Sequence, residues 1–261
     1  MSSLQKTWDN YHRFALQRGK LVTAIIAQFT IIKDKNILDI GCGDGGTSFK
    51  FAHFGALVTA VDIRPELVDR FKNSSIKFFH GSIENFSLTR KKFDIIILQD
   101  VLEHVPNPET TINKIKSLLS QTGIIYISTP NRLSIINLVS DPHWNFPCIS
   151  LFSRRWVKLF IKTIFRKDRR KRKDWAALLS LFKLRKLLSR NKLEMSFVNS
   201  IVCKNLFEEP ETVVCRPSHL KLINLMKQLN LKKLVLKIVN DKFGIFNYFI
   251  NPTWYIIGKL K

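Results

Sequence analysis

The stretch that decides the fold is Asn36-Ile37-Leu38-Asp39-Ile40-Gly41-Cys42-Gly43-Asp44-Gly45-Gly46. Its first five residues form a short apolar run, of the kind found in a strand that is buried on both faces of a parallel sheet. Gly41, Gly43 and Gly46 have the spacing G-x-G-x-x-G, in which the missing side chains let the backbone turn tightly and approach a nucleotide-like ligand. The stretch therefore predicts a strand, a ligand-binding turn and the start of a helix.

Short apolar runs alternate with helical patterns after this stretch. This alternation predicts an α/β fold with a largely parallel sheet and right-handed crossovers. The predicted strands of this part are residues 36–40, 57–62, 76–80, 93–98 and 123–129. The predicted helices between them are 47–53, 65–72 and 107–119. Later in the chain the patterns predict helices at 175–190 and 220–239 and strands at 193–198 and 254–257.

Two acidic residues narrow the chemistry of the ligand. Asp62 ends the second predicted strand, about 20 residues after the glycines, where a carboxylate can accept hydrogen bonds from both hydroxyls of a ribose. Asp39 lies two residues before Gly41. A carboxylate there would repel a pyrophosphate, but it suits a cationic sulfonium ligand with a free amino group.

Further motifs lie upstream of the glycine loop and after the fourth and fifth predicted strands. They are His12-Arg13 with Arg18, Phe93-Asp94, Leu102-Glu103-His104-Val105-Pro106-Asn107-Pro108 and Ser128-Thr129-x-Asn131-Arg132. Together with the glycine loop and Asp62, they resemble the class I S-adenosylmethionine (SAM) dependent methyltransferases, and among these the ubiquinone-biosynthesis O-methyltransferase group. The resemblance covers roughly residues 10–135. It implies a Rossmann-like fold, with a seven-stranded, mostly parallel sheet, helices on both faces and a helical insertion after the fifth strand.

The resemblance also implies which residues meet the cofactor. Asp62 would hold the ribose, Gln99 would lie along the cofactor, and Arg18 would reach the methionine carboxylate. Ser82 stands where many relatives place an Asp that meets the adenine amino group. The alternatives are a solvated Arg18 and a structural Gln99. The predicted cofactor-binding set is Arg18, Asp39, Gly41, Gly43, Gly45, Asp62, Ile63, Ser82 and Gln99.

Methyl transfer to a hydroxyl requires a group that accepts the proton. The candidates are His143, His104 and Asp100, near the ends of the fourth and fifth predicted strands. The spacing of Asp100, Glu103 and His104 resembles the E-x-x-E-H divalent-metal pattern of some ubiquinone-pathway methyltransferases and of small-RNA 2′-O-methyltransferases, with His143 as a distal ligand. The same residues can instead support the turn after the fourth strand. A divalent metal is therefore a possibility that we do not expect.

The formal net charge of +23 is concentrated late in the chain. Residues 1–150 contain 17 basic and 13 acidic side chains, and residues 151–261 contain 26 and 7. Residues 153–166 form a basic amphipathic pattern, followed by a polybasic run over 167–173. These residues can lie on an anionic membrane surface, grip the phosphates of a nucleic acid, or cover the core as a lid with solvated charges. The aromatic residues interleaved within the helix favour the membrane surface.

The sequence thus predicts three segments. They are a SAM-binding methyltransferase core over 1–131, a basic aromatic insertion or lid over 132–174, and over 175–261 the completion of the fold with a basic amphipathic helix. Four widely spaced cysteines and the lack of an apolar leader or membrane-spanning run predict a cytoplasmic protein that can be peripheral on the inner face of a membrane.

The expected activity is O-methylation of a hydrophobic or lipid-linked small molecule or of a glycan precursor. RNA methylation by means of the basic C-terminal half is one alternative, and a non-catalytic SAM-binding scaffold is another. The acceptor atom and the oligomeric state are left open by the sequence.

Overall fold

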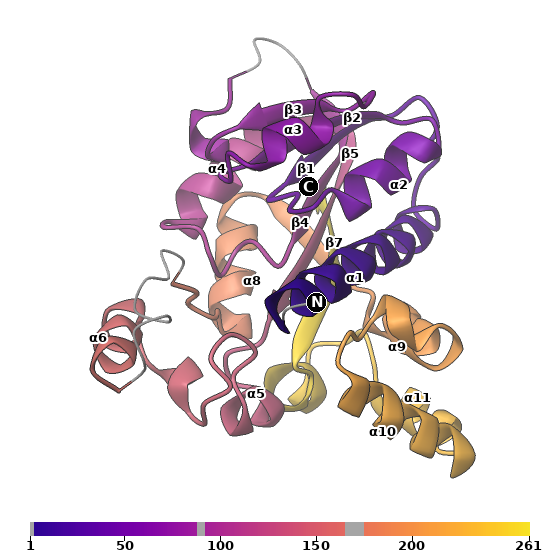
Figure 1. Cartoon of the computed structure of the whole chain (residues 1–261), viewed down its shortest axis with the longest axis vertical. Coiled ribbons are helices and arrows are strands. Elements are labelled where there is room, and N and C mark those ends of the chain that lie inside the picture. Colours follow the sequence, from indigo (N-terminus) through magenta and orange to yellow (C-terminus); the bar gives the residue numbers. More distant parts are fainter. Residues whose placement is uncertain (1–2, 88–91, 165–174) are drawn as a thin grey trace.

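A computed structural model describes residues 3–87, 92–164 and 175–261 of the chain (Figure 1). Its centre is a seven-stranded sheet in the order β3-β2-β1-β4-β5-β7-β6. The strands are β1 (Asn36–Ile40), β2 (Leu57–Asp62), β3 (Lys77–His80), β4 (Phe93–Gln99), β5 (Leu119–Pro130), β6 (Leu193–Phe197) and β7 (Thr253–Leu260). This confirms the predicted Rossmann-like, mostly parallel sheet, since β7 alone runs antiparallel to its neighbours β5 and β6.

The register of the parallel strands brings the predicted site residues to one edge. Asp39 of β1 lies opposite Ala60 of β2 and Ile97 of β4, so these three strands end close together. The strand order reverses between β1 and β4, which is the switch point where open α/β sheets bind ligands beyond the carboxyl ends of their strands.

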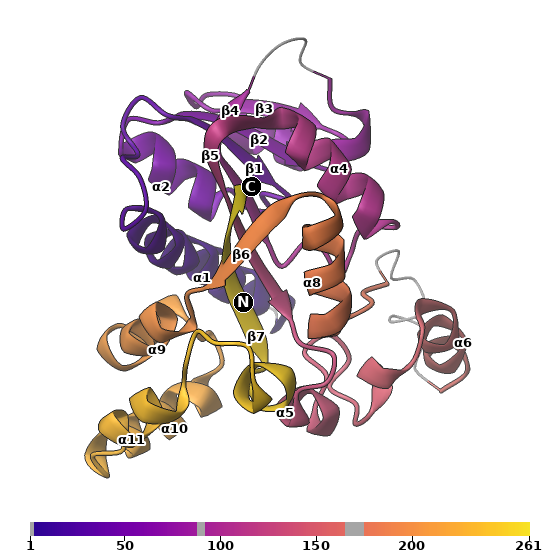
Figure 2. The same cartoon turned by 180° about the vertical axis from the view of Figure 1, so that it is seen from behind.

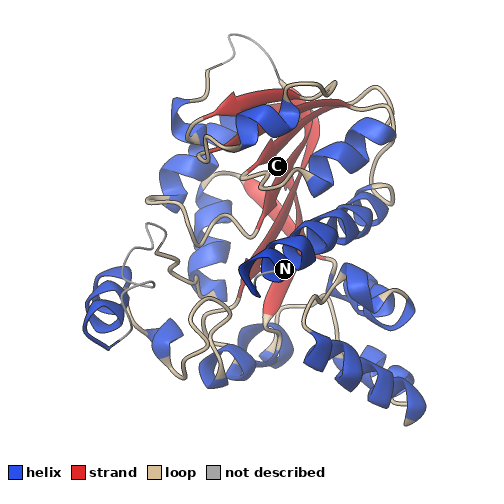
Figure 3. Cartoon of the chain, viewed as in Figure 1, coloured by secondary structure: helices blue, strands red, loops and turns tan. Residues whose placement is uncertain are grey.

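Helices cover both faces of the sheet (Figures 1 and 2). Each face has its own apolar core, and the apolar strand residues alternate between the two. The helices α1 (Ser3–Ile26), α2 (Gly46–His53), α3 (Leu67–Phe71) and α9 (Asn199–Glu208) bury their side chains on one face. The helices α4 (Pro108–Leu118) and α8 (Leu181–Arg190) cover the other face. Figure 3 shows the resulting layers of helix, sheet and helix.

The segment after β5 contains the elements α5 (Ile135–Val139), η2 (Ile149–Leu151) and α6 (Arg154–Ile164). A small separate core lies beneath it, in which Val157 and Ile161 of α6 pack near Trp144. Trp144 also stacks on Trp175, with ring centroids 5.5 Å apart. The polybasic run predicted at 167–173 lies outside the described residues.

Several boundaries differ from the prediction. The helix predicted over 220–239 is in fact two helices, α10 (Pro217–Gln228) and α11 (Lys232–Ile238), because the chain turns at Asn230 with a positive φ of 53°. The helix predicted to begin at 175 begins at Leu181, where the Ser180 hydroxyl accepts a hydrogen bond from the Lys183 N–H. The sequence analysis did not predict α1 or α9. The chain also contains three short helical turns, η1 (Ile83–Asn85), η3 (Pro210–Thr212) and η4 (Phe246–Ile250).

A close backbone contact joins α1 to the glycine loop. A Cβ atom added at Gly46 would lie 2.1 Å from the carbonyl oxygen of Ala15, and one added at Gly19 would lie 2.4 Å from the carbonyl oxygen of Gly46. No side chain fits between α1 and the first turn of α2. The third glycine of the motif is therefore required for helix packing.

We expect Gly46→Ala to destabilise the fold by about 2 kcal/mol, because α1 must move away from α2. In a chain of this size that is a fall of about 4–8 °C in melting temperature, measurable by calorimetry. The matched control is Gly244→Ala, whose added Cβ meets no atom within 4 Å. Equal melting temperatures for the two variants would contradict the close packing.

Candidate active site

The glycine loop after β1 is held to the end of β2 by Asp62. The buried Asp62 carboxylate accepts hydrogen bonds from the Gly43 N–H (2.9 Å) and the Arg64 N–H (3.0 Å). Gly43 has a φ of 54°, which glycine adopts at little cost. Since each carboxylate oxygen has two acceptor sites, Asp62 retains the capacity to accept hydrogen bonds from ribose hydroxyls.

Asp39 is buried directly beneath this loop. Its carboxylate accepts a hydrogen bond from the Ser48 hydroxyl at 2.6 Å. Burial, with a contribution from the negative charge of Asp62, raises the pKa of the Asp39 carboxyl to about 7. Burial and the same two carboxylates also raise the pKa of the Cys42 thiol, which makes a nucleophilic role for it unfavourable. The environment of the loop therefore favours a ligand that carries positive charge.

The charge of the site can be compared with the charge of SAM. The buried carboxyl groups of Asp39 and Asp62 lie under the loop, and Arg64 forms an ion pair with Asp62, with its Nε 3.5 Å from Oδ1. Because an ionised carboxylate buried without compensation is costly, an ammonium and a sulfonium placed here would be favourable. The residues therefore fit a cationic nucleoside such as SAM.

The remaining cofactor candidates surround the same edge. Gln99 ends β4, and its side-chain oxygen accepts a hydrogen bond from the Thr47 hydroxyl at 3.0 Å. Ile63 follows Asp62 with 70% of its surface exposed, which leaves an apolar side chain beside the expected ribose. Ser82 caps η1 by accepting a hydrogen bond from the Glu84 N–H, and its hydroxyl donates to the Glu84 carboxylate.

Arg18 lies in a different environment from the one expected of a carboxylate-binding residue. Its guanidinium is buried, with Nη2 at 3.1 Å from the Asp100 carboxylate and Nη1 at 3.1 Å from the Tyr255 hydroxyl. The Ser128 hydroxyl donates a second hydrogen bond to Asp100. Arg18 is therefore paired within the protein, and its predicted contact with the methionine carboxylate would have to be made in addition to this pair.

A second cluster combines three of the four predicted metal-binding or catalytic residues. The Nε2 atoms of His104 and His143 are 3.2 Å apart. Oε1 of Glu103 lies 3.9 Å from the first and 4.0 Å from the second, and burial raises the pKa of this carboxyl. Asp100 does not join the cluster, because its carboxylate is held by Arg18 and Ser128.

The cluster satisfies part of the requirement for a divalent cation. Its three atoms are close enough to share one ion at the usual ligand distances of about 2.0–2.2 Å. Oε1 of Glu103 is buried and has no hydrogen-bond partner among the described residues. If an ion is bound, Glu103, His104 and His143 would hold it, and it would lower the pKa of an acceptor hydroxyl. Asp100, the first acid of the metal-binding pattern, is instead ion-paired with Arg18.

The backbone of this cluster is tied to the segment that follows β5. Arg154, the first residue of α6, donates hydrogen bonds to the carbonyl oxygens of Glu103 (3.0 Å) and Val105 (2.9 Å). The Ala177 N–H donates to the same Glu103 carbonyl at 2.7 Å. The sequence pattern placed Arg154 on the basic face of the predicted amphipathic helix, and the structure shows that its guanidinium connects α6 to the backbone of the cluster.

Comparison with known proteins agrees with this geometry. A methyltransferase-domain family model matches residues 31–167, so the chain belongs to the methyltransferase-domain family. The fold is that of the class I SAM-dependent methyltransferases, for which SAM is the methyl donor.

The matching relatives include ubiquinone-biosynthesis O-methyltransferases. The protein of that name from Coxiella burnetii is 37% identical over 113 residues, which are 41% of this chain and 48% of the relative. The mitochondrial protein of Schizosaccharomyces pombe is 30% identical over 155 residues, which are 53% of this chain and 56% of the relative. The chain thus spans about half the length of the curated relatives that it matches.

Solved structures support the fold over nearly the whole chain. The plantazolicin methyltransferase BpumL, bound to a triazolic desmethylPZN analogue and SAH, has a TM-score of 0.54 at 19% identity and covers 98% of this chain and 90% of its own. A SAM-dependent methyltransferase from Mesorhizobium loti has a TM-score of 0.56 at 14% identity, with coverages of 90% and 95%. Similarity at this identity defines the architecture.

The raised pKa of Asp39 predicts a pH-dependent stability. The folded chain keeps the Asp39 proton up to about pH 7, whereas the unfolded chain loses it near pH 4. Stability should therefore fall as the pH rises through this window. For the wild type without cofactor, we expect the free energy of unfolding to fall by on the order of 3 kcal/mol between pH 4 and pH 8 on account of Asp39. Asp39→Asn should lose this dependence. Urea unfolding followed by fluorescence measures both.

The control for this experiment is Asp69→Asn, which changes an exposed acid on α3 and should keep the wild-type pH profile. Calorimetric titration of the same proteins with SAM at pH 8 should show at least tenfold weaker binding for Asp39→Asn, because the carboxylate no longer attracts the cationic ligand. Parallel stability profiles of wild type and Asp39→Asn would contradict the assigned pKa.

Proposed function

We propose that the protein transfers a methyl group from SAM to an oxygen atom of a hydrophobic or lipid-linked small molecule, at the surface of an anionic membrane. The observation that carries this proposal is a connection between the histidine cluster and the basic helix α6. Arg154, at the start of α6, donates hydrogen bonds to the backbone of the cluster. The same helix has an exposed apolar surface. The O-methyltransferase names of the relatives support oxygen as the acceptor atom.

When bound, SAM supplies an electrophilic methyl group on a sulfonium sulfur. The residues of the chain have to hold the acceptor hydroxyl, exclude water and accept the proton. The His104–His143 pair can accept this proton, because each imidazole can share it with the other across 3.2 Å. The positive charge of the resulting imidazolium would favour ionisation of Glu103, about 4 Å away, and the carboxylate would in turn stabilise the imidazolium. Asp100 serves in this proposal as the partner that holds Arg18, and no metal is required.

The acceptor class can be tested by incubating the protein with labelled SAM and separate lipid, glycan and RNA fractions. We expect the lipid fraction to take up the label. His104→Asn and His143→Asn should each lower the rate by about 10²–10⁴-fold and leave the affinity for SAM unchanged, since neither imidazole lies in the glycine loop. His219→Asn on α10 is the control.

Two results would contradict parts of this proposal. Uptake of label by RNA alone, with steep salt dependence, would favour the nucleic-acid alternative. Loss of activity with a chelator and its return on addition of Mg²⁺ or Zn²⁺ would show that the cluster acts through a metal.

The membrane part of the proposal rests on α6. Val157 and Ile161 are buried against the small core, whereas Trp156 and Leu159 are 60% and 53% exposed. Trp156 and Leu159 lie on the outer surface of α6 beside basic side chains. These apolar and basic side chains line a hollow of about 440 Å³. Its residues are Arg155, Trp156, Lys158, Leu159 and Lys162. A helix that served only as a lid would pack all of its apolar side chains on the core. In α6, Trp156 and Leu159 remain exposed.

The charge of this region fits an anionic partner. Between residues 132 and 164 the chain has one acidic side chain, Asp141, and it is buried. Each basic residue near an anionic lipid surface contributes about 1 kcal/mol, and an exposed Trp is suited to the headgroup region. Among the described residues, no helix has the length and apolar character needed to cross a bilayer. The proposed contact is accordingly peripheral.

Flotation with vesicles tests this contact. We expect the protein to float with vesicles containing phosphatidylglycerol and to remain unbound with phosphatidylcholine alone. Trp156→Ser combined with Lys158→Glu should lower the bound fraction at least tenfold, because it removes an apolar anchor and two units of positive charge.

The matched control is Phe182→Ser combined with Lys183→Glu, which makes the same kind of change on the exposed side of α8. Equal loss of flotation in both double variants would mean that the total charge, and not α6, determines binding.

A further inference from the structure

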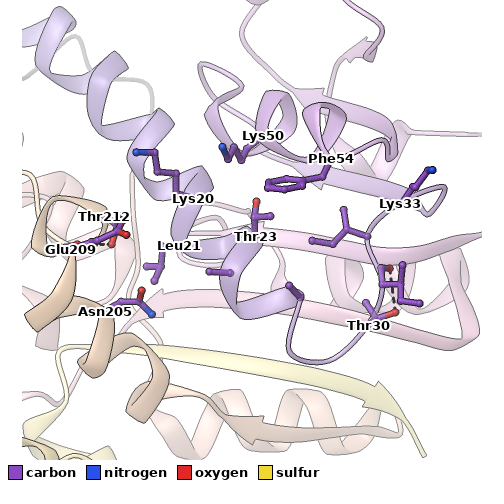
Figure 4. Close-up of a pocket in the computed structure, with 14 residues that line it drawn as sticks. Lys20, Leu21, Thr23, Thr30, Lys33, Lys50, Phe54, Asn205, Glu209 and Thr212 are labelled. Atoms are coloured by element: carbon purple, nitrogen blue, oxygen red, sulfur yellow. Dashed lines mark hydrogen bonds between the residues drawn. The ribbon is translucent and has the colours of Figure 1, made fainter.

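A groove of about 760 Å³ lies on the surface away from the cofactor edge (Figure 4). It is bounded by the second half of α1, the end of α2, the turn before β1, and residues of α9 and η3. Because α2 runs back across the sheet from Gly46 to His53, the groove lies near the beginning of β1, at the opposite edge from the glycine loop. None of the proposed cofactor-binding or catalytic residues lines it.

The floor of the groove is apolar, whereas Asn205, Glu209 and Thr212 form a polar wall on one side. Leu21 and Ile32 are buried at its base, and Ala24 leaves an open trough along α1. Ile31 is 76% exposed and Phe54 is 47% exposed at the rim. The polar Thr23 hydroxyl is already bonded to the Gly19 carbonyl oxygen. The volume lies within the range of about 300–1,000 Å³ that is typical of small-molecule pockets, and adjoining exposed apolar side chains commonly mark a binding surface.

The rim of the groove is positively charged. Lys20, Lys33 and Lys50 line it, against Glu209 as the only acid in the lining. Among the described residues, none of the three lysines forms an ion pair with a carboxylate, and Lys50 Nζ instead lies 5.2 Å from the centre of the Phe54 ring. In Figure 4 the Phe54 ring lies between Lys50 and Lys33.

We propose that this groove binds a single-chain anionic amphiphile, namely a fatty acid in its carboxylate form. The alkyl chain would lie over Leu21, Ala24 and Ile32, and the carboxylate would contact the rim lysines. A second copy of the chain is a poorer occupant, because a two-fold interface would place like-charged rims opposite each other. A cationic or uncharged head group would leave the three lysines without counter-charge.

The test is calorimetric titration of the whole chain with laurate, below the concentration at which it forms micelles. We expect saturable 1:1 binding, at least tenfold tighter than that of dodecyltrimethylammonium, and none with acetate, which has the head group alone. Ala24→Trp should weaken laurate binding at least tenfold by filling the trough. Lys33→Glu combined with Lys50→Glu should do the same by reversing the charge of the rim.

Matched controls make the result specific to the groove. Leu222→Trp on α10, and Lys183→Glu combined with Lys186→Glu on α8, change exposed residues elsewhere and should bind laurate normally. All variants should keep their affinity for SAM, which shows that they are folded and separates this site from the proposed active site.

The proposal is overturned if laurate shows no saturable binding, if the cationic amphiphile binds equally well, or if the groove variants and the controls behave alike. Sedimentation that shows a dimer which Ala24→Trp disperses, together with no laurate binding by the wild type, would identify a second copy as the occupant and would also overturn the proposal.

Discussion

The hydrogen bond from the Gly43 N–H to the Asp62 carboxylate is the interaction on which the active site depends. It joins the loop after β1 to the end of β2, so the turn and Asp62, the acid expected to bind the ribose, take fixed positions together. The parallel register of the two strands makes this contact possible, because both strands end at the same edge. The end of the loop at Gly46 is in turn held by its close backbone contact with α1.

Two buried carboxyl groups give this loop an environment that favours a cationic ligand. Asp39 lies below the glycines with Ser48 as its hydrogen-bond donor, and in the folded chain without a cation it holds its proton to about pH 7. A ligand that brings an ammonium or sulfonium removes the cost of ionisation, whereas a pyrophosphate would increase it. The same argument explains why a Rossmann-like fold can bind SAM in place of a dinucleotide.

The second half of the site is assembled from distant segments. His104 follows β4 and His143 lies beyond β5, yet their Nε2 atoms are 3.2 Å apart. Arg154 holds the backbone of this cluster from the start of α6 and thereby connects an exposed basic helix to the proposed catalytic histidines.

The sequence by itself determined the strands, the glycine loop and the roles expected of Asp39 and Asp62, because these depend on local apolar runs and on spacing within one β-α-β unit. It did not predict α1, although Leu21, Val22, Ile25 and Ile26 recur at helical spacing. The pairing of Arg18 with Asp100 and Tyr255, the exclusion of Asp100 from the histidine cluster, and the use of Arg154 were decided only by the tertiary structure. The hydrogen bonds involved join residues that lie between 28 and 237 positions apart, and no local pattern records which side chain of a distant element will satisfy a buried charge.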